Sequence, residues 1–133
     1  MRYCFIKFFI NDRESFSRMK DLFLYIKSLK DEELQIPELY NDNNILNFYT
    51  DKEIDIFSSD DRWDYEDIFD CIGNGEYYFK EIKEIENGTA FLYFNPISYP
   101  YGGVEPIIEF LLSFSMRIIS FDNGYMPEYH YIN

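Results

Sequence analysis

Carboxylates are the side chains of this sequence with the greatest capacity for chemistry. The chain has 25 Asp and Glu residues against 12 Lys and Arg, and its formal net charge is −13. The acidic residues are densest in residues 51–70, here named the acidic segment. It holds nine acidic and two basic residues, and therefore seven of the thirteen net negative charges. Carboxylates at this density could work as general acids and bases, ligate a divalent cation, or attract a cationic partner.

The enzymatic and metal-binding uses of these acids lack a supporting motif. Asp51, Glu53 and Asp55 alternate as the ligands of a calcium loop do, but the glycine that such a loop needs for its sharp turn is missing. No pair of acids has a surrounding sequence that marks it as an acid and base pair. A small enzyme that uses two carboxylates, with or without a divalent ion, remains an alternative on composition alone.

Other catalytic residue types are sparse. The single histidine is His130, three residues from the end, and Cys4 and Cys71 lie in apolar runs that favour the protonated thiol. The sequence has no HExxH, no paired-cysteine zinc spacing and no phosphate-binding loop. We therefore expect no catalytic residue, no metal site and no cofactor, and we predict that the chain is not an enzyme.

A docking surface for a cationic protein is the use of the acidic segment that we predict. Tyr65, Ile68, Phe69 and Ile72 have helical spacing, so a helix over 62–72 would place several acids on its outer side. The predicted partner-binding residues are Asp51, Glu53, Asp55, Asp60, Asp61, Trp63, Asp64, Glu66, Asp67 and Asp70. A solvated face that only promotes solubility is the alternative, and Trp63, the sole tryptophan, would equally suit a core or an interface hot spot.

Length and composition limit the classes of protein to which this chain could belong. A chain of 133 residues and 16.2 kDa is a single domain, residues 1–133, and its 21% aromatic content favours a packed core over disorder. The negative charge disfavours direct nucleic-acid binding, and no apolar stretch reaches the ~18 residues of a membrane span. Lys7 interrupts the apolar start, so we expect a strand there rather than a signal peptide. Two cysteines favour reduced core thiols in a cytoplasmic protein.

The first third of the chain has clear periodicity. Residues 2–10 predict a central strand that is covered on both faces, because few of its positions are polar. An amphipathic stripe predicts a helix over 12–30, with Asn11 and Glu14 as a capping box. Residues 31–44 have the composition of a loop.

The rest alternates between helix and strand patterns. We predict short strands at 45–49 and 54–57, then the helix at 62–72, capped by Asp60 or Asp61 and ended by glycines 73 and 75. A hairpin follows, with arms 76–86 and 89–95 around Asn87-Gly88, then an apolar helix from Pro106 and a strand at 116–121. The order predicts an α+β fold, a mainly antiparallel or mixed sheet packed by about three helices in a single pair of layers.

The second half of the chain resembles a known class of bacterial protein. The residues that carry the resemblance are NGTAFLYFNP at 87–96, YPYGG at 99–103, the apolar helix after it and MRIISF at 116–121. They cover about a quarter of the chain, and they are similar to immunity proteins of polymorphic and contact-dependent growth-inhibition toxin systems. No binding residue carries over, because such proteins differ in how they dock.

The resemblance implies a cytoplasmic protein that binds a cognate toxin and occludes its active site. Many such toxins are basic nucleases, so the expected partner is a basic toxin domain, with no direct nucleic-acid or membrane partner. Two alternatives stay open, the carboxylate or metal-dependent enzyme described above and a non-catalytic acidic interaction module. A homodimer that buries part of the aromatic surface is compatible with the latter.

Overall fold

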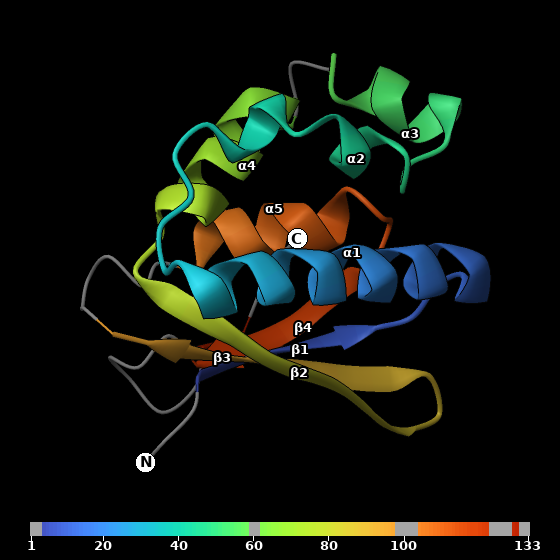
Figure 1. The fold of residues 1–133 in the computed structure, drawn as a ribbon. Coiled ribbons are helices and arrows are strands. Elements are labelled where there is room, and N and C mark those ends of the chain that lie inside the picture. The colour runs from blue at the N-terminus through green and yellow to red at the C-terminus, as the bar shows by residue number, and fades with distance from the viewer. Residues whose placement is uncertain (1–3, 59–61, 98–103, 123–128, 131–133) are drawn as a thin grey trace.

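A five-stranded antiparallel sheet with helices packed on one of its faces forms the fold (Figure 1). The computed structural model describes residues 4–58, 62–97, 104–122 and 129–130. The strands are β1 Cys4–Phe9, β2 Tyr77–Glu86, β3 Thr89–Pro96, β4 Arg117–Asp122 and β5 Tyr129–His130. The helices are α1 Arg13–Glu32, α2 Asn43–Leu46, α3 Asp51–Ile56, α4 Tyr65–Asn74 and α5 Glu105–Leu112, with a short 3-10 helix η1 at Leu39–Asn41. The predicted α+β class is confirmed.

The sheet has the order β2-β3-β1-β4-β5, and every pair of neighbours is antiparallel. Of the two predicted sheet types, the antiparallel one is therefore correct. β1 lies in the middle, as its apolar composition predicts. β5 was not predicted, because two residues are too short to show a period.

Burial on the two faces of β1 is unequal, which corrects the expectation of cover on both faces. Ile6 and Phe8 are fully buried beneath the helices, whereas Phe9 on the opposite face is 38% exposed. The aromatic residues of that second face pack against one another across the strands, since the rings of Phe5 and Phe91 meet edge to face at 5.3 Å. Lateral ring contacts therefore explain its apolar composition without complete burial.

The β2–β3 hairpin turns at Asn87-Gly88 as predicted. Both residues have positive φ angles, 52° and 78°, which is the backbone of a type I′ turn and matches the twist of the two strands. The Gly88 carbonyl then accepts a hydrogen bond from the Ile10 amide at 2.7 Å. The turn is thereby attached to the end of the central strand.

Helix α1 is confirmed almost to the residue, but its cap is not. The Asp12 carboxylate, rather than Asn11, accepts the Ser15 amide at 3.1 Å. The Asn11 side chain instead donates to the Ser115 carbonyl at 2.9 Å, which ties the start of the helix to the segment before β4. Asp competes well for an N-cap position because its charge also favours the positive end of the helix dipole.

The two strands predicted at 45–49 and 54–57 are wrong; both segments are short helices. Asp42 caps α2 by accepting the Asn44 amide, and Thr50 and Glu53 form a reciprocal capping box at the start of α3. Each cap satisfies backbone amides that a short helix leaves unpaired. These local hydrogen bonds override the β propensity of the Ile, Phe and Tyr residues in the segment.

Helix α5 lies between the sheet and α4, so the outer helices cover its far side (Figure 1). The Phe110 ring of α5 contacts Phe79 of β2 on one side, at 6.4 Å, and Phe69 of α4 on the other, at 6.3 Å. This position explains why the sequence of α5 is apolar nearly all round. Helices α2 to α4 thus add cover beyond the first layer of helices.

Helix α4 begins later than predicted and is capped by a different residue. Asp64 accepts the Asp67 amide at 2.8 Å, while the predicted caps Asp60 and Asp61 lie outside the described residues. Gly73 is inside the helix, where a Cβ atom would lie 2.4 Å from the Ile36 carbonyl oxygen. Gly75 ends the helix in an extended conformation. Close packing, rather than left-handed backbone, therefore explains Gly73.

Lys30 connects the end of α1 to the end of α4. Its side chain is fully buried, and its ammonium group donates to the carbonyls of Ile72 and Gly75, each at 2.9 Å. The same group lies 4.7 Å from the centre of the Tyr77 ring. A hydrogen-bond donor at a helix C-terminus is favourable because the last carbonyls have no partner within the helix. Lys30 therefore acts as the cap of α4.

Replacing this cation tests its contribution to stability. Lys30→Met removes the ammonium donor from two buried carbonyls and leaves the Ile72 carbonyl with only the Gly75 amide at 3.3 Å, so we expect the free energy of unfolding to fall by about 2 kcal/mol in urea denaturation. Lys20→Met, at an exposed position of the same helix, is the control and should change it by less than about 0.5 kcal/mol. Equal effects of the two variants would contradict the capping role.

The same residue gives the stability a defined dependence on pH. Burial lowers the pKa of Lys30 from 10.5 to about 8. Across the interval between these values the unfolded chain binds more protons than the folded one, so the contribution of Lys30 to stability rises with pH there. We expect the difference in unfolding free energy between the wild type and Lys30→Met to be larger at about pH 9.5 than at about pH 7.5. A difference that stays constant would contradict this prediction.

Candidate functional site

The acidic segment occupies the outer layer of helices, on the side of α5 that faces away from the sheet (Figure 1). It runs through α3 and into α4, and the structure describes it over 51–58 and 62–70. Asp60 and Asp61 lie outside the described residues. The exposed acids that it does describe are Asp51, Asp55, Asp64, Glu66, Asp67 and Asp70.

Glu53 differs from the other predicted partner-binding acids because it is only 8% exposed. Its carboxylate forms an ion pair with Arg18 of α1 and accepts the Thr50 backbone amide at 2.8 Å. The hydrogen bond to Glu53 is the largest cause of a raised pKa of the Arg18 guanidinium. Glu53 therefore fixes α3 onto α1, and its charge is neutralised inside the protein.

The exposed acids carry charge that the described residues do not neutralise. Asp64 caps α4 and Asp70 accepts from the Asn74 side chain at 3.0 Å, but neither contact involves a cation. Within the described ranges, the ion pairs join Arg13 to Glu84, Arg18 to Glu53 and Lys27 to Asp31. None of these includes an exposed acid of the segment.

The negative potential of these acids raises the pKa values of neighbouring titratable groups. The pKa of the Tyr40 hydroxyl is raised by partial removal from water and then by the charges of Glu38, Glu66 and Asp70. The pKa of the Cys71 thiol is raised by partial removal from water and then by the charges of Asp70 and Asp67. The carboxylates along α4 therefore act together on the same region. Cys71 itself is exposed, so the predicted core position is correct only for Cys4.

An apolar groove borders these acids. It has a volume of about 520 Å³, and its walls come from α2, α3 and the start of α4. The lining residues are Leu46, Ile54, Phe57, Ser58, Asp64, Tyr65 and Glu66. Leu46, one of the lining residues, is 38% exposed. Apolar side chains surrounded by charged ones are typical of the centre and rim of a protein interface.

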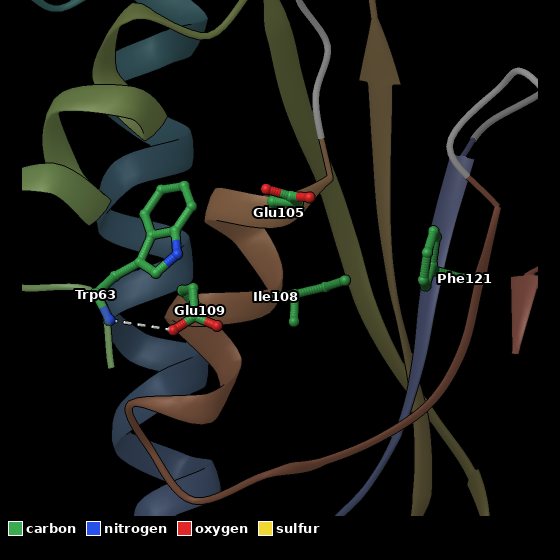
Figure 2. Close-up of a pocket in the computed structure, with 5 residues that line it drawn as sticks. All are labelled: Trp63, Glu105, Ile108, Glu109 and Phe121. Atoms are coloured by element: carbon green, nitrogen blue, oxygen red, sulfur yellow. Dashed lines mark hydrogen bonds between the residues drawn. The ribbon is translucent and has the colours of Figure 1, made fainter. Parts of the chain in front are cut away.

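Trp63 lies in a second pocket, which crosses α5 (Figure 2). Trp63 stands on one side of the helix and Phe121 of β4 on the other, with Glu105, Ile108 and Glu109 between them. The Trp63 backbone amide donates to a Glu109 carboxylate oxygen at 3.4 Å. Trp63 is partly buried against the edge of the core, so it is neither a core residue nor a fully exposed one.

Sequence reasoning missed the residues that surround Trp63. Glu105 and Glu109 are spaced by four on a helix whose other positions are mostly apolar, and this was the signal that could have identified them. Nothing local marks Phe121 or Leu46, because their proximity to the acidic segment arises from tertiary packing.

The described residues do not support the metal-binding alternative. Asp51, Glu53 and Asp55 lie on helix α3 rather than in a loop, and Glu53 points to Arg18. No group of three or more His, Cys, Asp or Glu side chains in the described ranges could hold a metal ion. The partial resemblance to a calcium loop is therefore a coincidence of spacing.

Comparisons with protein-family models, with curated proteins and with solved structures find no match. Among the described residues, the helices are too short or too polar to cross a membrane.

The different roles of two acids on α3 can be separated by mutation. Glu53→Gln removes a half-buried ion pair and weakens the capping box, so we expect the free energy of unfolding to fall by about 1–2 kcal/mol. Asp55→Asn, at an exposed position of the same helix, should change it by less than about 0.5 kcal/mol. Chemical denaturation measures both, and a larger loss for Asp55→Asn would contradict the assignment.

Proposed function

We propose that this chain is an immunity protein, a binding protein that neutralises a basic toxin domain by covering its active site. The observation that carries the proposal is on α3 and α4, where the exposed acids have no cationic partners in the described structure and two of them, Asp64 and Glu66, line an apolar groove. The acidic residues offered to the partner are Asp51, Asp55, Asp64, Glu66, Asp67 and Asp70. No reaction by this chain is part of the proposal.

Long-range electrostatic attraction is the first step of the proposed encounter. Surface charges of one sign raise the rate at which an oppositely charged protein associates, by factors of about 10–10³ at low salt. The exposed acids of α3 and α4 lie on neighbouring helices, so their fields add at distances comparable with the Debye length of roughly 10 Å. A basic partner would be drawn to this face in preference to the sheet.

Contact with the groove is the second step. Leu46, Ile54 and Phe57 present apolar surface in a concave site, and burial of such surface supplies binding free energy that exposed charges do not. Asp64 and Glu66 at its border would then face cationic groups on the rim of the partner. The charges would thus raise the association rate, and the groove would supply affinity.

The chemistry of the partner follows from the charge of this face. A nuclease binds phosphates through a basic cleft, and a surface of carboxylates presents negative charges to the same cleft. Occupation of the cleft would exclude the nucleic acid without any chemical step. The sequence resemblance to immunity proteins supports the same role.

Neutralising the acids of this face should slow association. In a variant with Asp55→Asn, Glu66→Gln, Asp67→Asn and Asp70→Asn, we expect the association rate to fall by about tenfold at low ionic strength, and the difference to shrink in high salt. The partner used is the protein encoded by the reading frame adjacent to that of this chain, provided that it contains a basic domain, and stopped-flow mixing measures the rate.

A matched control keeps the change in total charge constant. Asp21→Asn, Glu32→Gln, Glu81→Gln and Glu86→Gln remove four exposed carboxylates of α1 and β2. This control should associate nearly as fast as the wild type. Equal slowing by both variants would assign the effect to net charge alone. Failure of the wild type to bind that domain or to block its activity would overturn the proposed function.

A further inference from the structure

We infer that the pocket across α5 binds an arginine side chain of the basic partner. This inference rests on the proposed function, which it extends by naming the group that is recognised and the residues that recognise it. The pocket has a volume of about 330 Å³ and is lined by Trp63, Glu105, Ile108, Glu109 and Phe121.

The pocket is lined by both apolar and acidic side chains. Trp63 and Phe121 stand on opposite sides of α5, and Ile108 lies between them, so the space is bounded by apolar groups (Figure 2). The two glutamates project from the same helix, one turn apart. An occupant would therefore meet an aromatic ring and two carboxylates at once.

A guanidinium group satisfies both kinds of neighbour. Its flat face stacks on an aromatic ring and is attracted to the π electrons of indole, the strongest partner for cations among the aromatic side chains. Its edge carries five N–H donors that can be shared between two carboxylates. An ammonium group is a point charge and cannot use the ring and both acids equally well.

Neither glutamate forms an ion pair among the described residues, although Arg62 lines an adjoining pocket together with Glu109. Glu109 accepts one hydrogen bond, from the Trp63 backbone amide, and this contact holds the tryptophan beside the helix. Glu105 is exposed and Glu109 is half-buried, and they are like charges at a spacing where side chains repel. A cation placed between them would remove this repulsion.

Size and position fit a side chain of the proposed partner. The volume is near the lower limit of small-molecule pockets, which range over about 300–1,000 Å³. Its negative lining excludes phosphates and other anions. Trp63 belongs to the acidic segment, so a basic protein that docks on α3 and α4 would bring its neighbouring side chains to this pocket.

The single tryptophan lines this pocket and provides a fluorescence readout of binding there. The probes are the tripeptides acetyl-Gly-Arg-Gly-amide, the same peptide with citrulline, which has the shape of arginine without its charge, and the same peptide with lysine. We expect a saturable change of Trp63 fluorescence with the arginine peptide, and at least tenfold weaker binding of the citrulline peptide. Binding of the lysine peptide should lie between them.

Two variants identify the recognising groups. Glu105→Gln with Glu109→Gln removes both charges and keeps an acceptor for the Trp63 amide, and we expect the affinity for the arginine peptide to fall at least tenfold. Glu81→Gln with Glu86→Gln, at exposed positions of β2, is the control and should bind like the wild type. Absence of saturable binding, equal binding of the citrulline or lysine peptide, or full binding by the pocket variant would overturn the inference.

A binding test with a basic domain from the adjacent reading frame distinguishes failure of this inference from failure of the proposed function. If the wild type captures that domain and the pocket variant dissociates no faster, the function stands and the pocket assignment is wrong. If the arginine peptide binds as expected but the wild type does not capture the domain, the pocket binds a guanidinium and the proposed partner is wrong.

Discussion

Aromatic packing on the outer side of α5 is the interaction on which the rest of the structure depends. The Tyr49 ring stacks on Phe114 at 4.2 Å, and its hydroxyl shares a hydrogen bond of 2.8 Å with Ser113 at the end of the helix. Phe69 of α4 contacts the same cluster. Each aromatic pair contributes about 0.5–1.5 kcal/mol beyond the burial of its area. This exceeds the few tenths of a kcal/mol that a pair of exposed like charges costs, so the outer helices can carry many acids and stay attached.

The acids of the outer layer divide into two groups by whether their carboxylates make contacts within the fold. Glu53 faces inward and pairs with Arg18, and the Asp64 carboxylate is used at the start of α4, so both contribute to the fold. Asp51, Asp55, Glu66 and Asp67 have no such partner among the described residues. The packing of the first group presents the second group to solvent. The negative face is thus a consequence of ordinary capping and ion pairing at neighbouring positions.

Sequence reasoning succeeded where a local pattern was sufficient. The stripe of α1, the Asn87-Gly88 turn and the proline at the start of α5 each specify an element through local chemistry. It failed at 45–57, where β-branched and aromatic residues indicate strands but Thr50 and Glu53 form helix caps. For the candidate site, the exposure of most acids was predictable from the helical period. The burial of Glu53 and the pocket around Trp63 were not, because both depend on residues far away in the chain.

The two features of the proposed interface would act at different stages of one binding event. Exposed carboxylates act over roughly 10 Å and are screened by salt, so they would govern how often the partner arrives in a useful orientation. The pocket around Trp63 acts only in contact, where partial burial strengthens each charge interaction, and it would govern how long the partner stays. A protein that must neutralise its target needs both fast capture and slow release. The acidic segment would provide them together, because Trp63 joins the charged helices to the pocket on α5.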